Sequence, residues 1–249
     1  MISRLTTATA LALALAAPAY AFDITNMTDA EREAFRAEVR SYLLDNPGVI
    51  MEAVDALEAQ QAQAQADADV QMVADNADAL FEGHGWVGGN PEGDVTVVEF
   101  MDYRCGYCRR ADPEVSELIE SDGNIRFILK EFPILGENSE ISSKFAIAVR
   151  NVAGDDAYKA AHDALYAMNQ DMSEPVLQRL AESLGVDADA VLAEMESDAV
   201  AQEIADNRAL AREMQISGTP SFVMGERLVR GYVPLDGMRQ VIAGERADG

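Results

Sequence analysis

The N-terminal part of the chain has the apolar spacing of helices. Large apolar side chains recur three or four residues apart between positions 28 and 44: Phe35, Val39, Tyr42 and Leu43. This spacing predicts a first helix, which Asn46-Pro47-Gly48 would end. A second helix is predicted over 49–81, where Ile50, Val54 and Leu57 give way to a stretch rich in Ala, Gln and Asp.

The second predicted helix has little to bury within its own monomer. It is either a stalk that pairs with other copies of the chain or a semi-flexible connector. We favour self-association, because Ile50, Val54 and Leu57 need a partner surface. The heptad pattern is too short to fix the number of chains.

Beyond a glycine-rich boundary at 83–93, the spacing becomes that of buried strands. Trp86-Val87-Gly88 is a candidate short strand, and Val95–Phe100 is β-branched and nearly continuously apolar. A helix containing Pro113 follows, and Ile125–Phe132 is a second strand of the same kind. The strand–helix–strand order predicts a parallel pair with a crossover helix.

The remaining residues return to a helical pattern before one last change. Four or five helices fit into 139–215. Ser221–Met224 and Leu228–Arg230 then predict a hairpin around Gly225-Glu226, and a last helix begins near Pro234. The predicted class is therefore α/β.

Composition and charge narrow the classes of partner. Asp and Glu number 44 and Lys and Arg 19, which gives a formal net charge of -25. A nucleic-acid-binding protein needs a basic surface, so that class is excluded, and an anionic membrane surface is disfavoured for the same reason. An acidic, solvated surface without a specific partner is the simplest interpretation.

The first residues have the features of a secretory signal peptide. Arg4 supplies a positive charge, Leu5–Ala17 is apolar, and Ala19-Tyr20-Ala21 is a small-x-small cleavage site. The apolar run is shorter than the ~20 residues of a membrane span, and Pro18 interrupts it. We expect cleavage after Ala21, so that 1–21 is the signal peptide, and export to the periplasm.

The chain has two cysteines, Cys105 and Cys108, in the motif Cys-Gly-Tyr-Cys. A disulfide that closes so small a loop constrains little of the unfolded chain, so a structural role is not expected. Zinc needs four ligands, and no histidine lies near the pair in sequence. Covalent haem needs His at position 109, which is Arg. A redox pair remains, with no cofactor and no metal.

The position of the pair gives its two sulfurs different roles. If a helix begins at Cys105, unpaired backbone N–H groups and the nearby Arg104, Arg109 and Arg110 favour its thiolate. Cys108 lies one turn further in and would resolve the mixed disulfide. Gly106 and Tyr107 leave access to the first sulfur and are candidate substrate contacts.

A proline-containing turn supplies a second candidate element. Thr219-Pro220 precedes the strand Ser221–Met224, where a proline is tolerated at the strand start. If the bond is cis, the Thr219 backbone turns toward a ligand, and a substrate chain can pair with it. An ordinary trans proline is the alternative.

Several segments together resemble the DsbA-like branch of the thioredoxin superfamily. They are the strand at 95–100, the cysteine motif, Pro113, Lys130-Glu131-Phe132-Pro133-Ile134-Leu135-Gly136, the helical segment and Gly218-Thr219-Pro220-Ser221-Phe222. Residues 43–50 and the helix after them look like the N-terminal region of ScsC-type proteins.

The resemblance implies a thioredoxin fold over 83–249 with a helical insertion at about 139–215, and an N-terminal helical extension over 22–82. It implies a disulfide-exchange enzyme with a cis proline at position 220. It further implies that Glu99 is a buried acid that relays a proton to Cys108, with Lys130 as its neighbour. The alternative for Glu99 is a strand-end residue in contact with solvent.

The implied partners are exported cysteine-containing proteins, a membrane redox partner and further copies of the chain through the N-terminal helix. DsbA-type oxidants often have Pro-His between the cysteines, whereas Gly-Tyr also occurs in isomerases, so both directions of exchange stay open. A different class is a copper-tolerance protein that holds a soft cation with the two thiols. A weaker alternative is a holder of unfolded chains that works without the cysteines.

Overall fold

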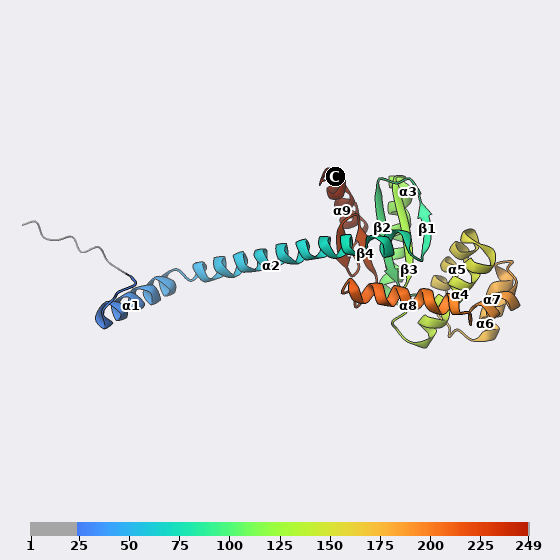
Figure 1. Cartoon of the computed structure of the whole chain (residues 1–249), viewed down its shortest axis with the longest axis horizontal. Coiled ribbons are helices and arrows are strands. Elements are labelled where there is room, and N and C mark those ends of the chain that lie inside the picture. Colours follow the sequence, from blue (N-terminus) through green and yellow to red (C-terminus); the bar gives the residue numbers. More distant parts are fainter. Residues whose placement is uncertain (1–23, 249) are drawn as a thin grey trace, which may run out of the picture. The chain divides into compact units, whose positions relative to one another are not determined.

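The computed structural model describes residues 24–248, so the expected signal peptide at 1–21 lies outside the described residues. The chain divides into two compact units, 1–59 and 60–249. The elements are α1 (Asp29–Asp45), α2 (Gly48–Asp75), η1 (Asp78–Glu82), β1 (Trp86–Gly89), β2 (Val95–Met101), α3 (Gly106–Asp122), β3 (Ile125–Glu131), α4 (Glu137–Ala153), α5 (Asp155–Ala167), α6 (Glu174–Ser183), α7 (Ala188–Glu194), α8 (Asp198–Glu213), β4 (Ser221–Met224), β5 (Arg227–Arg230) and α9 (Leu235–Asp248) (Figure 1). Among the described residues, no helix is long and apolar enough to cross a membrane.

The first unit contains α1 and the beginning of α2. Thr28 caps α1 in a capping box: its hydroxyl accepts from the Glu31 N–H, and Glu31 Oε2 accepts from the Thr28 N–H at 2.9 Å. No residue of α1 is buried. Many large apolar side chains between residues 24 and 59 are exposed: Phe35, Val39, Tyr42, Leu44, Ile50, Met51, Val54 and Leu57. Both predicted N-terminal helices are thus present, and these apolar side chains of α1 and of the first half of α2 are uncovered.

The second predicted helix ends earlier than its sequence pattern suggests. The α-helical hydrogen bonding of α2 stops at Asp75, and a π-helical turn, η1, follows. The Asn76 side chain donates to the Met72 carbonyl at 2.9 Å, which satisfies an acceptor at the end of α2. Val73 and Leu80 are buried on the two sides of this change.

A mixed sheet forms the centre of the second unit. Within the described residues its strand order is β1-β3-β2-β4-β5. The predicted parallel pair is confirmed: β2 pairs with β3 in parallel, with Val95 opposite Ile125 and Met101 opposite Glu131. The predicted hairpin is also confirmed, since β4 and β5 are antiparallel.

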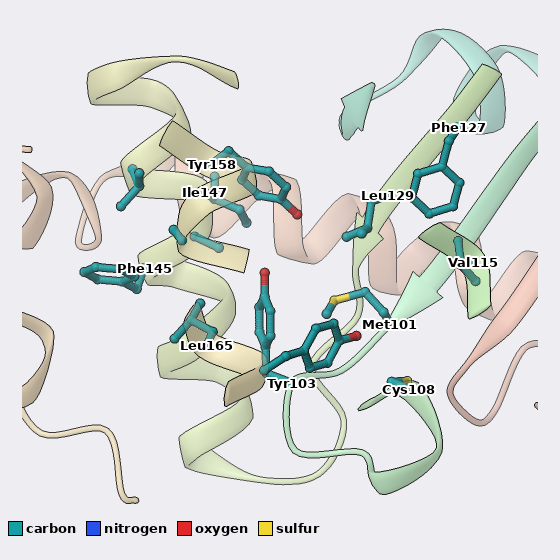
Figure 2. Packing of buried hydrophobic residues seen from close by; sticks show 14 of the residues in the cluster. Met101, Tyr103, Cys108, Val115, Phe127, Leu129, Phe145, Ile147, Tyr158 and Leu165 are labelled. Carbon is teal, nitrogen blue, oxygen red and sulfur yellow. The ribbon is translucent and has the colours of Figure 1, made fainter. Parts of the chain in front are cut away.

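The alternation of side chains along β2 and β3 separates two apolar layers. Val97, Met101, Phe127 and Leu129 face a layer with α3, α5 and α9. Val98, Phe100 and Ile128 face the opposite layer, which includes Val73, Leu80 and the end of α8. Figure 2 shows part of the first layer, with Leu129 and Phe127 of β3 between Val115 of α3 and Tyr158 of α5.

The helical segment between β3 and β4 consists of α4–α8, as the sequence predicts. α4 is its centre, because Phe145, Ala146, Ile147, Ala148 and Val149 are all fully buried. Met172 and Met195 are buried in the same layer and fill its core. The connection from β3 to β4 is therefore a group of helices packed around the buried helix α4.

Candidate active site

The two cysteines lie where β2 passes into α3. Cys105 is the N-cap residue, with φ -77° and ψ 118°, and α3 begins at Gly106. Cys105 has a relative exposure of 8%, whereas Cys108, one turn later, is fully buried. Both sulfurs are free thiols. The helix therefore starts where the sequence predicts, and Cys105 is more exposed to solvent than Cys108, as expected.

The Thr219–Pro220 peptide bond is cis and faces this helix start. The Cys105 Sγ donates to the Thr219 carbonyl oxygen at 3.1 Å, across 114 residues of sequence. Pro220 is buried and leads directly into β4, which pairs with β2. Residues that are distant in sequence thus form one site because β2 and β4 are neighbours in the sheet.

Asp102 organises the loop before Cys105, and the sequence analysis did not single it out. Its Oδ1 accepts from the Arg104 N–H at 2.7 Å, and its Oδ2 accepts from the N–H groups of Ile134 and Leu135 at 2.8 and 3.0 Å. Its carbonyl accepts from the Cys105 N–H at 3.0 Å. The available signal was an acid directly after a buried strand and before the motif. The carboxylate fixes the cysteine loop against the segment after β3.

Glu99 is a buried acid, so the solvent-exposed alternative is wrong. Its relative exposure is 3%, and its Oε1 has no hydrogen-bond partner among residues 24–248. Burial raises the pKa of Glu99 to about 8, and the nearby charges of Asp112 and Cys105 add to the rise. Burial also raises the pKa of the Cys108 thiol, and the charge of Glu99 reinforces this. The backbone of Asp102 opposes that shift in part.

The expected pair between Glu99 and Lys130 is wrong. Lys130 lies opposite Phe100 in the register, and Leu129 lies opposite Glu99. Because side chains alternate between the two faces of a strand, Lys130 and Glu99 lie on opposite faces of the sheet. The Lys130 amine donates instead to the His84 carbonyl.

The three arginines of the motif have partners other than the sulfur. Arg104 donates to the carbonyls of Gln170 and Asn169, and Arg109 donates to the Asn169 side chain and the Met168 carbonyl. These bonds attach the segment between α5 and α6 to the cysteine loop. The guanidinium of Arg110 lies 4.7 Å from the centre of the Tyr232 ring.

The two residues between the cysteines are open to solvent. A Cβ on Gly106 would meet no heavy atom within 4 Å. Tyr107 is 62% exposed and stacks on Tyr232, with ring centres 6.2 Å apart. Ile134 and Leu135, which Asp102 holds, are also exposed apolar side chains. The predicted contact residue Tyr107 thus offers an exposed apolar side chain two residues from Cys105.

The comparisons with known proteins agree with this geometry. The family of DSBA-like thioredoxin domains matches residues 96–243, which includes both cysteines and the cis proline. The chain belongs to this family. The N-terminal domain of the copper resistance protein ScsC matches residues 31–64.

Two solved structures have folds similar to a large part of this DSBA-like protein. A thioredoxin-like oxidoreductase from Silicibacter pomeroyi is 41% identical, with 68% of this chain and 97% of that chain covered and a TM-score of 0.64. The thiol-disulfide exchange protein alpha-DsbA2 from Wolbachia pipientis is 27% identical, with 73% and 97% covered and a TM-score of 0.68.

One curated relative is much longer than the matched region. The Na(+)/H(+) antiporter NhaA 3 of Salinispora tropica is 30% identical over 156 residues, which are 63% of this chain. The match spans about a quarter (24%) of the antiporter. This chain therefore spans only a small part of that protein's length, and the likeness carries no argument about ion transport.

Proposed function

We propose that this DSBA-like protein is a thiol–disulfide oxidoreductase that exchanges disulfides with exported, cysteine-containing proteins through Cys105 and Cys108. One observation carries the proposal: the Cys105 sulfur at a helix start lies 3.1 Å from the carbonyl before a cis proline, and the less exposed Cys108 lies one turn behind it. The descriptions of the Silicibacter and Wolbachia proteins as an oxidoreductase and a thiol-disulfide exchange protein support this reaction class.

In the oxidising direction, a substrate thiolate attacks Sγ of Cys105 in the disulfide form. A bond forms between the substrate sulfur and Cys105, and the Cys105–Cys108 bond breaks with its electron pair leaving on Cys108. A second substrate thiolate then attacks the first substrate sulfur and releases Cys105. The substrate loses two electrons and gains a disulfide, and the protein ends as the dithiol.

Burial makes a bare thiolate at Cys108 costly, so a proton has to reach it as it leaves. Glu99 can donate this proton to Cys108, because a pKa of about 8 keeps its carboxyl protonated at neutral pH. In the opposite direction the same carboxylate accepts the proton when Cys108 attacks the mixed disulfide. We therefore assign Cys105 as the exchanging sulfur, Cys108 as the resolving sulfur and Glu99 as the proton donor and acceptor.

The substrate side of the site consists of Thr219, Pro220, Gly106 and Tyr107. The free N–H and carbonyl groups of an extended substrate can pair beside Thr219, and Tyr107 supplies an exposed apolar face. Oxidant and isomerase use the same atoms and differ in the redox state that a membrane partner maintains. Two or more sites around one substrate favour isomerisation.

We further propose that residues 22–82 form an extension through which copies of the chain associate, and that 83–249 is the catalytic domain. The exposed apolar side chains of α1 and α2 and the ScsC-type match at 31–64 support the first part. Export to the periplasm after cleavage at Ala21 accords with the signal-peptide features of residues 1–21 and with a substrate pool of exported proteins.

The name of the ScsC-type domain favours a second candidate function, copper tolerance through the same thiol pair. Two thiolates suit Cu(I). Titration of Cu(I) into reduced protein against a chromophoric chelator tests this. Tight binding that Cys105→Ser abolishes would support copper tolerance, whereas no binding in competition with the chelator would eliminate it.

The test of the main proposal is catalysed refolding of one protein with several disulfides, supplied either fully reduced or with scrambled disulfides. We expect acceleration of at least one reaction, complete loss of that acceleration with Cys105→Ser, and no change with Ser121→Ala at the other end of α3. Absence of acceleration in both reactions, or full activity of Cys105→Ser, would contradict the proposal.

A further inference from the structure

A cavity behind the active site brings the buried Glu99 together with titratable groups that disulfide exchange does not use. It has a volume of about 290 Å³ and lies between α3, α5 and the sheet. Asp112 of α3, His162 of α5 and the buried Glu99 are among its lining residues. Asp163 follows His162 on α5, and one ligand atom each of Asp112, His162 and Asp163 lie within 4.8 Å of one another.

The hydrogen bonds around His162 decide which ring nitrogen faces the cavity. The Tyr103 hydroxyl lies 2.8 Å from Glu131 Oε1 and 3.2 Å from His162 Nδ1. Nδ1 is thus held by Tyr103 inside the core. This leaves Nε2 as the ring nitrogen that faces Asp112, a residue of the cavity wall.

Two potential metal ligands therefore face each other. His162 Nε2 lies 3.3 Å from Asp112 Oδ1. A neutral imidazole nitrogen and a carboxylate oxygen at this separation can bind one metal ion between them.

Three further features favour a metal ion. His162 is 3% exposed and is fixed by Tyr103, which is the outer-shell hydrogen bond that metal-bound histidines make. Asp112 and Asp163 add two carboxylates and remain accessible from solvent, so an ion has an entry path. Glu99 faces the same cavity with an unpartnered oxygen, which a metal-bound water can serve.

We propose that His162, Asp112 and Asp163 form a binding site for a divalent transition-metal ion such as Zn²⁺, separate from the two cysteines. One imidazole and two carboxylates suit Zn²⁺ better than Mg²⁺, which prefers oxygen ligands alone. A bound ion would join α3, which carries Cys108, to α5 of the helical insertion. The Lys159 amine forms an ion pair with Asp163 and competes with the metal.

The test uses oxidised protein, in which the sulfurs are bonded to each other and cannot take the metal. The chain has two histidines, and His84→Gln removes the other one, so that every imidazole signal comes from His162. Zn²⁺ is added while binding is followed by calorimetry and the ring nitrogens by ¹⁵N NMR. We expect one ion per chain and a shift of Nε2 that is complete at one equivalent, with Nδ1 still protonated.

Charge-neutral variants identify the carboxylate ligands. Asp112→Asn and Asp163→Asn should each weaken Zn²⁺ binding at least about tenfold, and Lys159→Gln should strengthen it, since a competing cation is gone. Asp156→Asn makes the same charge change on an exposed residue of α5 and should alter binding less than about twofold. The proposal is overturned if Nε2 does not respond to Zn²⁺, if His162 is an imidazolium at neutral pH in its presence, or if Asp156→Asn weakens binding as much as Asp112→Asn.

Discussion

The protonation of Glu99 can be measured through the stability of the fold. The pKa of its carboxyl is about 8 in the folded protein, against an ordinary value of 4.5 that applies to the unfolded chain. At about 1.36 kcal/mol per pKa unit, this difference corresponds to about 5 kcal/mol of unfolding free energy. Burial is the largest cause, and the negative charges near Glu99 act in the same direction.

The sign follows from the number of protons bound by each state. Between pH 4.5 and 8 the folded protein holds the Glu99 proton and the unfolded chain has released it, so stability falls as pH rises. The contribution is fully present below pH 4.5 and fully lost above about pH 8. Glu131 also makes the stability fall as pH rises, because burial raises its pKa to about 7.

The perturbation is Glu99→Gln, which keeps the shape and removes the titrating group. The buried amide adds an unpaired donor, a cost of about 1–3 kcal/mol that does not depend on pH. The contribution of Glu131 is common to both proteins and cancels in the difference between them. What remains is the pH dependence due to Glu99 alone.

The assay is urea unfolding of the reduced parent and Glu99→Gln at pH 5, 6, 7 and 8. The parent should lose stability relative to the variant by about 1.4 kcal/mol per pH unit, roughly 4 kcal/mol over the range. The control Glu92→Gln changes an exposed acid, and its stability should depend on pH in the same way as that of the parent. A stability difference between the parent and Glu99→Gln that stays constant within about 0.5 kcal/mol would refute the elevated pKa of Glu99.

Three other predictions follow from the contacts of the site and the extension. Cys108→Ala should accumulate mixed disulfides at Cys105, detectable by non-reducing electrophoresis, because no resolving sulfur remains; rapid turnover without such adducts would contradict the roles. Asp102→Asn should lower stability by about 1–3 kcal/mol in urea unfolding and slow exchange, since an amide has one acceptor oxygen for the backbone N–H groups that the carboxylate binds; an unchanged midpoint would argue against its organising role. Val54→Ala with Leu57→Ala should weaken self-association at least about tenfold by light scattering, because burying one such side chain contributes about 1.5–3 kcal/mol; an unaltered mass would place the interface elsewhere.

Local patterns along the chain were enough to predict most of the helices and strands and the reactive cysteine pair. Apolar runs at 95–100 and 125–132 predicted the parallel strands. Helical spacing predicted the N-terminal helices and a segment of four or five helices, of which the structure has five. These patterns are local, since a 3.6 or 2-residue period follows from the geometry of one helix or strand. The spacing of the two cysteines is equally local. The lack of nearby histidines in the sequence was enough to reject zinc binding and covalent haem attachment at that motif.

The contacts of a side chain depend on which face of a sheet or helix it occupies, and these contacts became clear only from the tertiary structure. Lys130 and Glu99 are one register position apart on the neighbouring strands β3 and β2. Because side chains alternate along a strand, the two lie on opposite faces of the sheet. The contact of Cys105 with Thr219 needs β2 and β4 to be neighbours, which no local pattern states. His162 illustrates the same limit: its helical position was predictable, but its place beside Asp112, 50 residues earlier in the chain, comes only from the packing of α5 against α3.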